Sequence, residues 1–208
     1  MLRLRIRPES RRTLAHYDAH ADSFWQGTRD HDVSQNLDAL LGALARRRSP
    51  PFRILDLGCG PGRDLAELAR RGHLPTGLDG ASRFAEMARA HAGCEVLHQD
   101  FLALALPAEA FDGIFCNASL FHVPRADLPR VLVELRSALA PGGVLFASNP
   151  RGADVEGFQG DRYCCFMELD AWAQLFVDAG FTLLSHYYRP PNRPRPEQPW
   201  LAMVLGRP

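Results

Sequence analysis

The sequence has no excess of charge of either sign, because 24 lysine and arginine residues balance 24 aspartates and glutamates. Nucleic-acid binding depends largely on neutralising phosphates, so a balanced chain of 208 residues is not expected to bind nucleic acid. Arginines do gather between residues 3 and 12 and at 46–48, where a local basic patch is conceivable. A solvated arm and a solvated helix end are the favoured interpretations of these two clusters.

The sequence has few cysteines, and their spacing shows no pairing motif. The five cysteines, an odd number, stand at positions 59, 94, 116, 164 and 165 without C-x-x-C spacing. This pattern argues against a disulfide framework and against a zinc site, so no metal is expected. Cysteines within apolar segments behave as small hydrophobic residues, which suits a reducing cytosol, and packing is also favoured for Cys164 and Cys165.

Long hydrophobic runs are absent. The N-terminus lacks the apolar segment of a signal peptide, and no run is long enough to cross a bilayer, so we expect a soluble, cytoplasmic protein without membrane contact. Hydrophobic residues nevertheless make up 46% of the chain, and its length suits one medium-sized domain with a single core.

From residue 52 onward, short apolar segments alternate with amphipathic ones. The predicted strands are 53–57, 74–78, 94–98, 111–116, 144–148, 182–188 and 200–206, and the predicted helices are 62–71, 82–91, 127–139 and 168–179. Alternation of strand and helix predicts an α/β fold with a doubly wound, mostly parallel sheet and helices on both faces. Only a proline-rich loop separates the last two strands, which predicts an antiparallel C-terminal hairpin.

The N-terminal quarter does not follow this alternation. Residues 1–12 are basic and aperiodic and are expected to form a flexible arm, followed by a single domain over 13–208. Residues 13–32 contain three aromatic side chains but no regular apolar period, and we expect a lid. Asp32 followed by Gln35 predicts a capping box for a helix that ends at Arg46–Arg48. The lid and this helix make up 13–48, and the Rossmann-like core spans 52–208.

The segment Ile54–Asp64 organises the chain. It predicts an apolar strand that enters a turn with glycines at 58, 60 and 62, followed by a helix. Glycine permits a tight turn and a close approach of a ligand, and the amides at a helix N-terminus favour an anionic or polar ligand. A nucleotide-like ligand is one interpretation, and a purely structural turn is the other. The spacing is one residue tighter than the G-x-G-x-x-G of dinucleotide-binding folds.

With Asp56 two residues before the first glycine, this segment resembles motif I of the class I S-adenosylmethionine-dependent methyltransferases. Three further segments resemble motifs of that family in the correct order: Asp100-Phe101, Phe111–Val123 and Leu139–Leu145. The resemblance covers residues from about 13 to the C-terminus. It implies seven strands with the last one inserted between the fifth and sixth, and S-adenosylmethionine as cofactor with S-adenosylhomocysteine as product.

The resemblance also implies a set of cofactor-binding residues: Tyr17, Trp25, Asp56, Gly58, Cys59, Gly60, Asp79, Gly80, Asp100, Phe101, Asn117 and Leu120. Asp79, at a strand end, can accept hydrogen bonds from a ribose diol, or it can cap the following helix. An aspartate acceptor beside a backbone donor suits adenine, as Asp100 and Phe101 would provide. Trp25 could stack on the cofactor or substrate, or pack on the first helix.

Candidate substrate-binding residues are Arg29, His31, Phe121 and Tyr163. Arg29 could grip a carboxylate or phosphate, although a surface ion pair with Asp30 or Asp32 is the favoured alternative. His122 follows the fourth predicted strand and could remove a proton from the acceptor, or simply pack there. Phe158, Tyr163 and Phe166 are expected to line the acceptor pocket.

The resulting prediction is methyl transfer to a small-molecule acceptor by in-line displacement, which needs positioning more than a strong acid or base. Two alternatives remain: a methyltransferase acting on RNA or protein, and a catalytically silent protein that binds S-adenosylmethionine. We expect a monomer or a homodimer.

Overall fold

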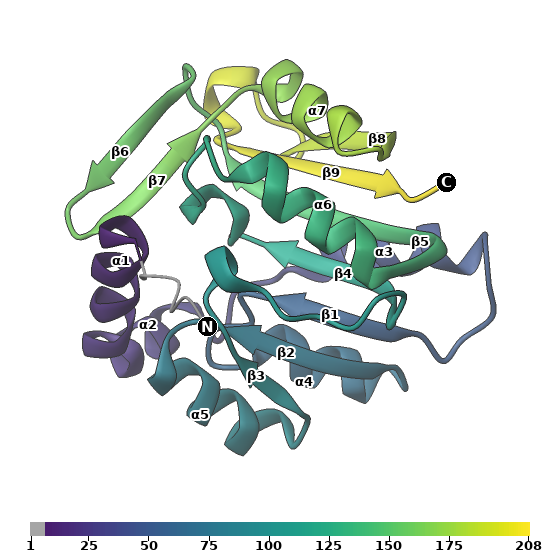
Figure 1. The fold of residues 1–208 in the computed structure, drawn as a ribbon, viewed down its shortest axis with the longest axis horizontal. Helices are drawn as coiled ribbons and strands as arrows, with labels where there is room; N and C mark the ends of the chain where they lie inside the picture. The colour runs from purple at the N-terminus through teal and green to yellow at the C-terminus, as the bar shows by residue number, and fades with distance from the viewer. Residues whose placement is uncertain (1–6) are drawn as a thin grey trace, which may run out of the picture.

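The computed structural model describes residues 7–208, and its centre is a seven-stranded sheet in the order β3-β2-β1-β4-β5-β9-β8 (Figure 1). The strands are β1 (Arg53–Leu57), β2 (Leu74–Asp79), β3 (Val96–His98), β4 (Phe111–Asn117), β5 (Leu139–Pro150), β8 (Thr182–Arg189) and β9 (Trp200–Gly206). Strands β1 to β5 pair in parallel, and β9 lies antiparallel between β5 and β8. The predicted α/β fold with its C-terminal hairpin is confirmed.

Helices cover both faces of the sheet because the strands are apolar on both sides. Phe115 and Phe146 stack at 5.1 Å on the face covered by α3 (Ser34–Ala45), α4 (Arg63–Arg70) and α5 (Ser82–Ala92). The alternate residues, such as Ile114 and Leu145, pack against α6 (Leu128–Ala138) and α7 (Leu169–Asp178). Trp172 of α7 is fully buried in this second layer. Burial on both faces explains why the strands read as continuous apolar runs.

Two helices precede α3, and the predicted flexible arm is partly wrong. Helix α1 (Pro8–Ala19) begins with a proline, whose fixed φ suits a first helical turn, and α2 (Ala21–Thr28) follows it. Residues 8–12 therefore belong to a helix, while residues 1–6 lie outside the described part. Arg12 holds α1 in place through an ion pair with Asp161 at 2.8 Å and lies over the Phe158 ring.

A second, two-stranded sheet was not predicted. Strands β6 (Val155–Gln159) and β7 (Arg162–Phe166) form a hairpin that projects from the main sheet and lies beside α1 (Figure 1). The predicted strand 144–148 is also longer than expected, because β5 already starts at Leu139. Leu139 pairs with Phe111 and Val144 with Gly113, so the intervening residues bulge out of the ladder.

The start of α3 differs slightly from the predicted capping box. The helix begins at Ser34, and Asp32 accepts a hydrogen bond from the Ser34 amide at 2.9 Å. The N-cap position itself is held by Val33, and the reciprocal bond from Gln35 is absent among the described hydrogen bonds. Asp32 thus satisfies one helix amide from just outside the helix.

The five cysteines are all free, and four of them are buried. Within residues 7–208, no helix combines the length and apolar character needed to cross a membrane. The same residues contain no group of three or more histidine, cysteine, aspartate or glutamate side chains placed to hold a metal ion.

The contact between α4 and α5 yields a stability prediction. Gly62 has φ +94°, and a Cβ there would lie 2.9 Å from Cα of Ala88. Gly62→Ala should lower the free energy of unfolding by about 3 kcal/mol, since a left-handed residue costs about 1–2 and overpacking about 1–3 kcal/mol. Gly72, with φ +82° and no atom within 4 Å, provides the matched control. Gly72→Ala should cost only about 1 kcal/mol in chemical denaturation, and equal losses would contradict the packing argument.

Candidate functional site

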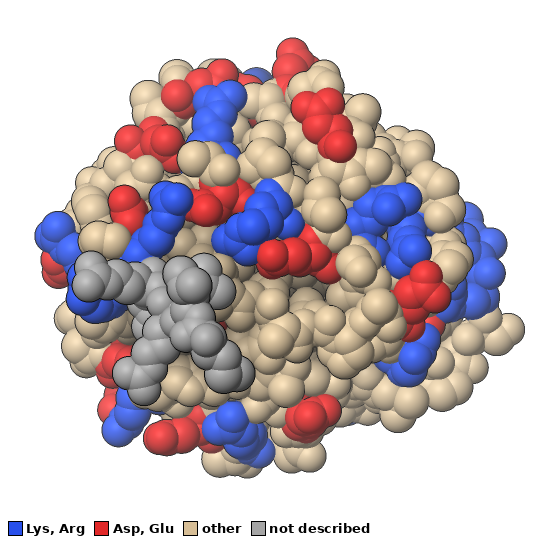
Figure 2. Space-filling model, viewed as in Figure 1, with Lys and Arg blue, Asp and Glu red and all other residues tan. Residues whose placement is uncertain are grey.

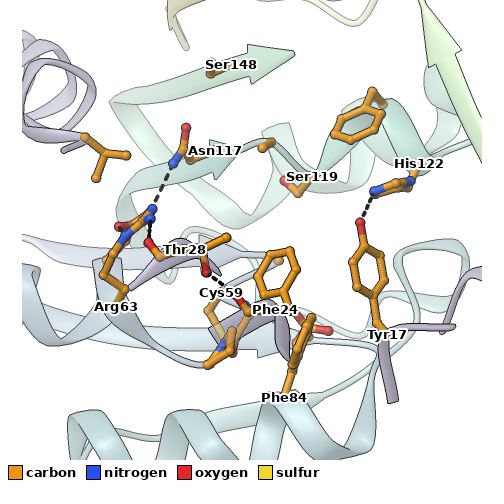
Figure 3. A pocket seen from close by; sticks show the side chains of 18 of the residues that line it. Tyr17, Phe24, Thr28, Cys59, Arg63, Phe84, Asn117, Ser119, His122 and Ser148 are labelled. Atoms are coloured by element: carbon orange, nitrogen blue, oxygen red, sulfur yellow. Dashed lines mark hydrogen bonds and ion pairs between the residues drawn. The ribbon is translucent and has the colours of Figure 1, made fainter. Parts of the chain in front are cut away.

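A cavity of about 780 Å³ opens at the C-terminal ends of the parallel strands. Its floor is formed by the turns after β1, β2 and β4 and by the end of β5, and helices α1 and α2 contribute its roof (Figure 3). This position follows from the topology, because the strand order reverses between β1 and β4 and leaves a crevice there. Residues 13–32 thus cover the site, as the predicted lid requires, although ordering by a ligand stays a prediction.

The glycine turn after β1 forms part of the floor. Gly58 has φ +78°, and a Cβ there would lie 2.5 Å from Cβ of Ser119, so no larger residue fits. A Cβ on Gly60 would instead point to the ring of Phe24 at 3.8 Å, across the cavity. Gly60 therefore contributes only backbone atoms to the cavity lining, between floor and roof.

Asp79 ends β2 and has both carboxylate oxygens engaged by backbone amides. One oxygen accepts from Gly60 and the other from Ala81, each at 2.9 Å. Asp79 therefore fixes the glycine turn and the start of α5, as the predicted turn role requires, and it also lines the cavity. Burial raises its pKa to about 6. Each oxygen retains a lone pair for a further donor.

Asp100, after β3, is tied to the N-terminal helix. Its Oδ2 accepts from the Ser10 hydroxyl at 2.6 Å, and its Oδ1 accepts from the Leu102 amide at 2.9 Å. Asp100, Phe101 and Leu102 all line the cavity. The contact with Ser10 shows that α1 is held directly at the ligand-facing edge.

Aromatic rings form the roof. The rings of Tyr17, Phe24 and Phe84 lie 5.0–5.7 Å apart in a cluster that faces the glycine turn. The sequence did not indicate Phe24 of α2 and Phe84 of α5 as site residues. Trp25 also lines the cavity and lies edge-on to His91 of α5, with ring centroids 4.9 Å apart.

Tyr17 and His122 point toward one another across the cavity (Figure 3). The Nδ1 atom of His122 lies 2.7 Å from the carbonyl oxygen of Tyr163, which can only accept, so Nδ1 carries the proton. The Nε2 atom then accepts from the Tyr17 hydroxyl at 2.7 Å. Burial lowers the pKa of His122 to about 4, and this histidine is therefore neutral near pH 7.

A chain of polar contacts crosses the site beside the glycine turn. Arg63 binds Asp64 through two hydrogen bonds of 2.7 and 3.0 Å and donates to the Thr28 carbonyl at 2.7 Å. Asn117 donates to Asp64 at 3.1 Å and accepts from Asn36 at 2.9 Å. Only Asn117 was predicted. Arg63 and Asp64 were missed, although they directly follow Gly62 of the glycine turn, and that position could have indicated them.

Most predicted site residues line this cavity: Tyr17, Trp25, His31, Gly58, Cys59, Gly60, Asp79, Gly80, Asp100, Phe101, Asn117, Phe121 and His122. Two predicted cofactor contacts do not. Asp56 is buried within β1 beneath the turn, where burial raises its pKa, and Leu120 is fully buried in the core. Asp56 belongs to a strand that is buried on both faces, and Leu120 packs into the apolar cluster against α6 and α7.

Two predicted substrate contacts also lie elsewhere. Arg29 is half-exposed and forms an ion pair with Asp30 at 3.4 Å, which is the alternative favoured from the sequence. The ring of Tyr163 lies against Phe158 of the β6–β7 hairpin, with centroids 5.4 Å apart, and neither ring lines the cavity. Tyr163 contributes to the site through its backbone, whose carbonyl binds His122 and whose amide binds Thr13. Phe166, expected in the same wall, also lies outside the cavity lining.

The core of this chain is similar to known methyltransferases. Residues 54–143 match the family described as "Methyltransferase domain". The ubiquinone biosynthesis O-methyltransferase of Histophilus somni (strain 2336) is 37% identical over 148 residues, covering 65% of this chain and 61% of that protein. The corresponding protein of Coxiella burnetii (strain RSA 493 / Nine Mile phase I) is 36% identical over 100 residues. That match covers 46% of this chain and 42% of the Coxiella protein.

Solved structures share the fold at lower identity. The [4+2]-cyclase SpnF has a TM-score of 0.73 at 18% identity, and the match covers 98% of this chain and 97% of that one. A second match is the Burkholderia thailandensis 1,6-didemethyltoxoflavin-N1-methyltransferase, whose structure contains 1,6-didemethyltoxoflavin and S-adenosylhomocysteine. Its TM-score is 0.66 at 22% identity, with 95% of this chain and 90% of that chain covered. At these identities the likeness concerns the fold.

Proposed function

Because this chain belongs to the class I S-adenosylmethionine-dependent methyltransferase family, we propose that it transfers a methyl group from S-adenosylmethionine to a small-molecule acceptor. One observation carries the proposal. The glycine turn opens into a cavity of about 780 Å³, with the carboxylates of Asp79 and Asp100 at the ends of neighbouring strands. A cavity of this size can enclose a nucleoside-containing molecule.

The residues present fit S-adenosylmethionine, which when bound supplies an electrophilic methyl group. The bare backbone of Gly60 leaves room beneath Phe24, and the free lone pairs of Asp79 suit ribose hydroxyl groups. Asp100 and the Phe101 amide provide an acceptor beside a donor for adenine. The Ser119 hydroxyl is buried and has no hydrogen-bond partner among the described residues, so it is available to a ligand at the same turn.

The acceptor would lie in the other half of the cavity, beside β4, β5 and the Leu120–His122 turn. There the Tyr17 hydroxyl and the neutral His122 form a pair that can relay a proton away from a hydroxyl or amine. Because the hydrogen of the His122 ring is on Nδ1, the Nε2 atom is unprotonated and can accept a proton through Tyr17. His122 is thus proposed as the terminal proton acceptor.

A small acceptor is favoured over RNA or protein by two features. Helices α1 and α2 roof the cavity, so an acceptor must fit beneath them. On the face shown in Figure 2, acidic side chains lie next to basic ones, without the broad single-sign field typical of nucleic-acid binding. The matched relatives named ubiquinone biosynthesis O-methyltransferases add support for a small acceptor.

Cofactor choice provides the direct test. Isothermal titration calorimetry on the full chain should show micromolar or tighter binding of S-adenosylhomocysteine and no measurable binding of NAD. Transfer of labelled methyl groups from S-adenosylmethionine to a metabolite extract then tests catalysis. Binding without transfer to any component would support the silent cofactor-binding alternative. Preference for NAD would refute the proposed cofactor.

A further inference from the structure

Arg162, at the start of β7, is a cavity-lining cation without a carboxylate partner. The ion pairs among residues 7–208 include none for Arg162, and residues 1–6 contain no aspartate or glutamate. Its neighbour Asp161 is already engaged by Arg12 through hydrogen bonds of 2.8 and 3.0 Å. The side chain is half-buried, so its charge is only partly solvated.

The groups around Arg162 do not neutralise it. Arg162 lies beside the Tyr17 hydroxyl, whose pKa burial raises, with Arg162 partly opposing that rise. Burial also lowers the pKa of His122, and the positive charge of Arg162 lowers it further. Tyr17 therefore keeps its proton and His122 stays neutral near pH 7. The guanidinium thus lies beside two neutral groups, the Tyr17 hydroxyl and the His122 ring.

The cavity lining carries charges of both signs. Asp79 and Asp100 stand at the ends of β2 and β3, Asp64 is neutralised by Arg63, and Asp30 and Asp32 lie before α3. Guanidinium groups enter the lining from two strands outside the parallel core. Arg162 comes from β7, and Arg189 from the end of β8, where its side chain donates to the Asp32 carbonyl at 3.0 Å. The Nε atom of Arg189 is buried without a hydrogen-bond partner among the described residues.

We propose that the methyl acceptor is a small carboxylic acid whose carboxylate binds Arg162, which directs the nucleophilic group of the acceptor toward Tyr17 and His122. The inference rests on the proposed function for the identity of the site. A planar guanidinium binds a carboxylate through two parallel hydrogen bonds, and this pairing is stronger where water is partly excluded. An amide of the same shape would leave the Arg162 charge without a counterion and should bind more weakly.

The test compares matched acids and amides on the full chain saturated with S-adenosylhomocysteine, which fills the cofactor half. The probes are benzoate and benzamide, 4-hydroxybenzoate and 4-hydroxybenzamide, and 3-phenylpropionate and 3-phenylpropionamide, with affinities measured by ligand-observed NMR titration. At least one acid should bind ten-fold or more tightly than its amide. Arg162→Gln should remove this preference, and Arg162→Lys should retain part of it. Arg11→Gln, an exposed position on α1, should leave it unchanged.

Two controls keep this result separate from the proposed function. Affinity for S-adenosylhomocysteine and the melting temperature should be the same in Arg162→Gln as in the unaltered protein. If S-adenosylhomocysteine does not bind at all, the cofactor proposal fails, and the acid preference is then measured on the protein alone. The carboxylate inference is overturned if no acid binds, if the amides bind as tightly as the acids, or if the preference survives in Arg162→Gln.

Discussion

The His122→Asn variant is expected to lose methyl-transfer activity by about 100-fold or more, since general acid–base groups contribute about 10²–10⁴-fold. Asparagine can place its amide nitrogen near the position of Nδ1 and so keep the bond to the Tyr163 carbonyl. It cannot reach the Tyr17 hydroxyl, which now lies 2.7 Å from Nε2. Folding and S-adenosylhomocysteine affinity should be retained, and single-turnover kinetics with a labelled methyl group measure the loss.

The companion variant His122→Gln separates proton transfer from positioning. Glutamine places an oxygen near the position of Nε2 and can still accept from Tyr17, but it cannot take up a proton. A similar loss in both variants indicates proton acceptance, whereas recovery in His122→Gln indicates that His122 only orients Tyr17. Because the pKa of His122 is about 4, kcat at saturating S-adenosylmethionine should be flat above about pH 5 and fall at lower pH as the histidine is protonated. His186→Gln, on the exposed side of β8, is the matched control.

The Asp79→Ala variant should bind S-adenosylhomocysteine more weakly by about 2–4 kcal/mol, as for two charge-assisted hydrogen bonds at a partly buried site. By the usual conversion this is a loss of about 30-fold to 900-fold in affinity. The variant also loses the bonds to the Gly60 and Ala81 amides, so its melting temperature should fall as well. Calorimetry and thermal unfolding measure the two effects independently. A lower melting temperature with unchanged affinity would mean that Asp79 stabilises the glycine turn but does not bind the ligand.

The pH dependence gives a second view of Asp79. Its pKa in the unbound protein is raised to about 6, so its contribution to stability is present below pH 4 and lost as the pH rises through 6. Ribose hydroxyls donate to the charged carboxylate and favour it. Affinity for S-adenosylhomocysteine should therefore increase from pH 5 to pH 7, with proton release on binding near pH 6. Asp79→Asn should abolish this dependence.

The main sheet was predictable because its signals are local. Buried parallel strands read as short apolar runs, and glycine marks the ends of the helices between them. The β6–β7 hairpin has no such signal, since Val155 and Phe158 are exposed and its packing partner, α1, is about 145 residues away in the chain. Helix α1 was missed for the same reason. Its fixed position depends on contacts with Asp100 and Asp161 rather than on an apolar period of its own.

The site was predictable at the strand ends and much less so in the loops. Asp79, Asp100 and Asn117 were identified because the topology brings their strand ends to one edge. Arg29 and Tyr163 were assigned to the substrate because of their residue types, but the direction of a loop side chain depends on tertiary packing. Arg162 was missed, although it is the neighbour of Tyr163 in the sequence. Successive side chains of a strand point to opposite sides, so Arg162 and not Tyr163 points toward the cavity.

The attachment of α1 to the hairpin has a consequence for how the cavity opens. A two-stranded hairpin is only marginally stable alone, and here β7 is held by the Tyr163 amide, which donates to Thr13 of α1 at 2.8 Å. The same helix binds Asp100 through Ser10 and His122 through Tyr17. We therefore expect hairpin and roof to open together, as one cooperative unit. Exchange of molecules beneath the roof should then depend on one opening free energy for the whole unit, rather than on independent fluctuations of its side chains.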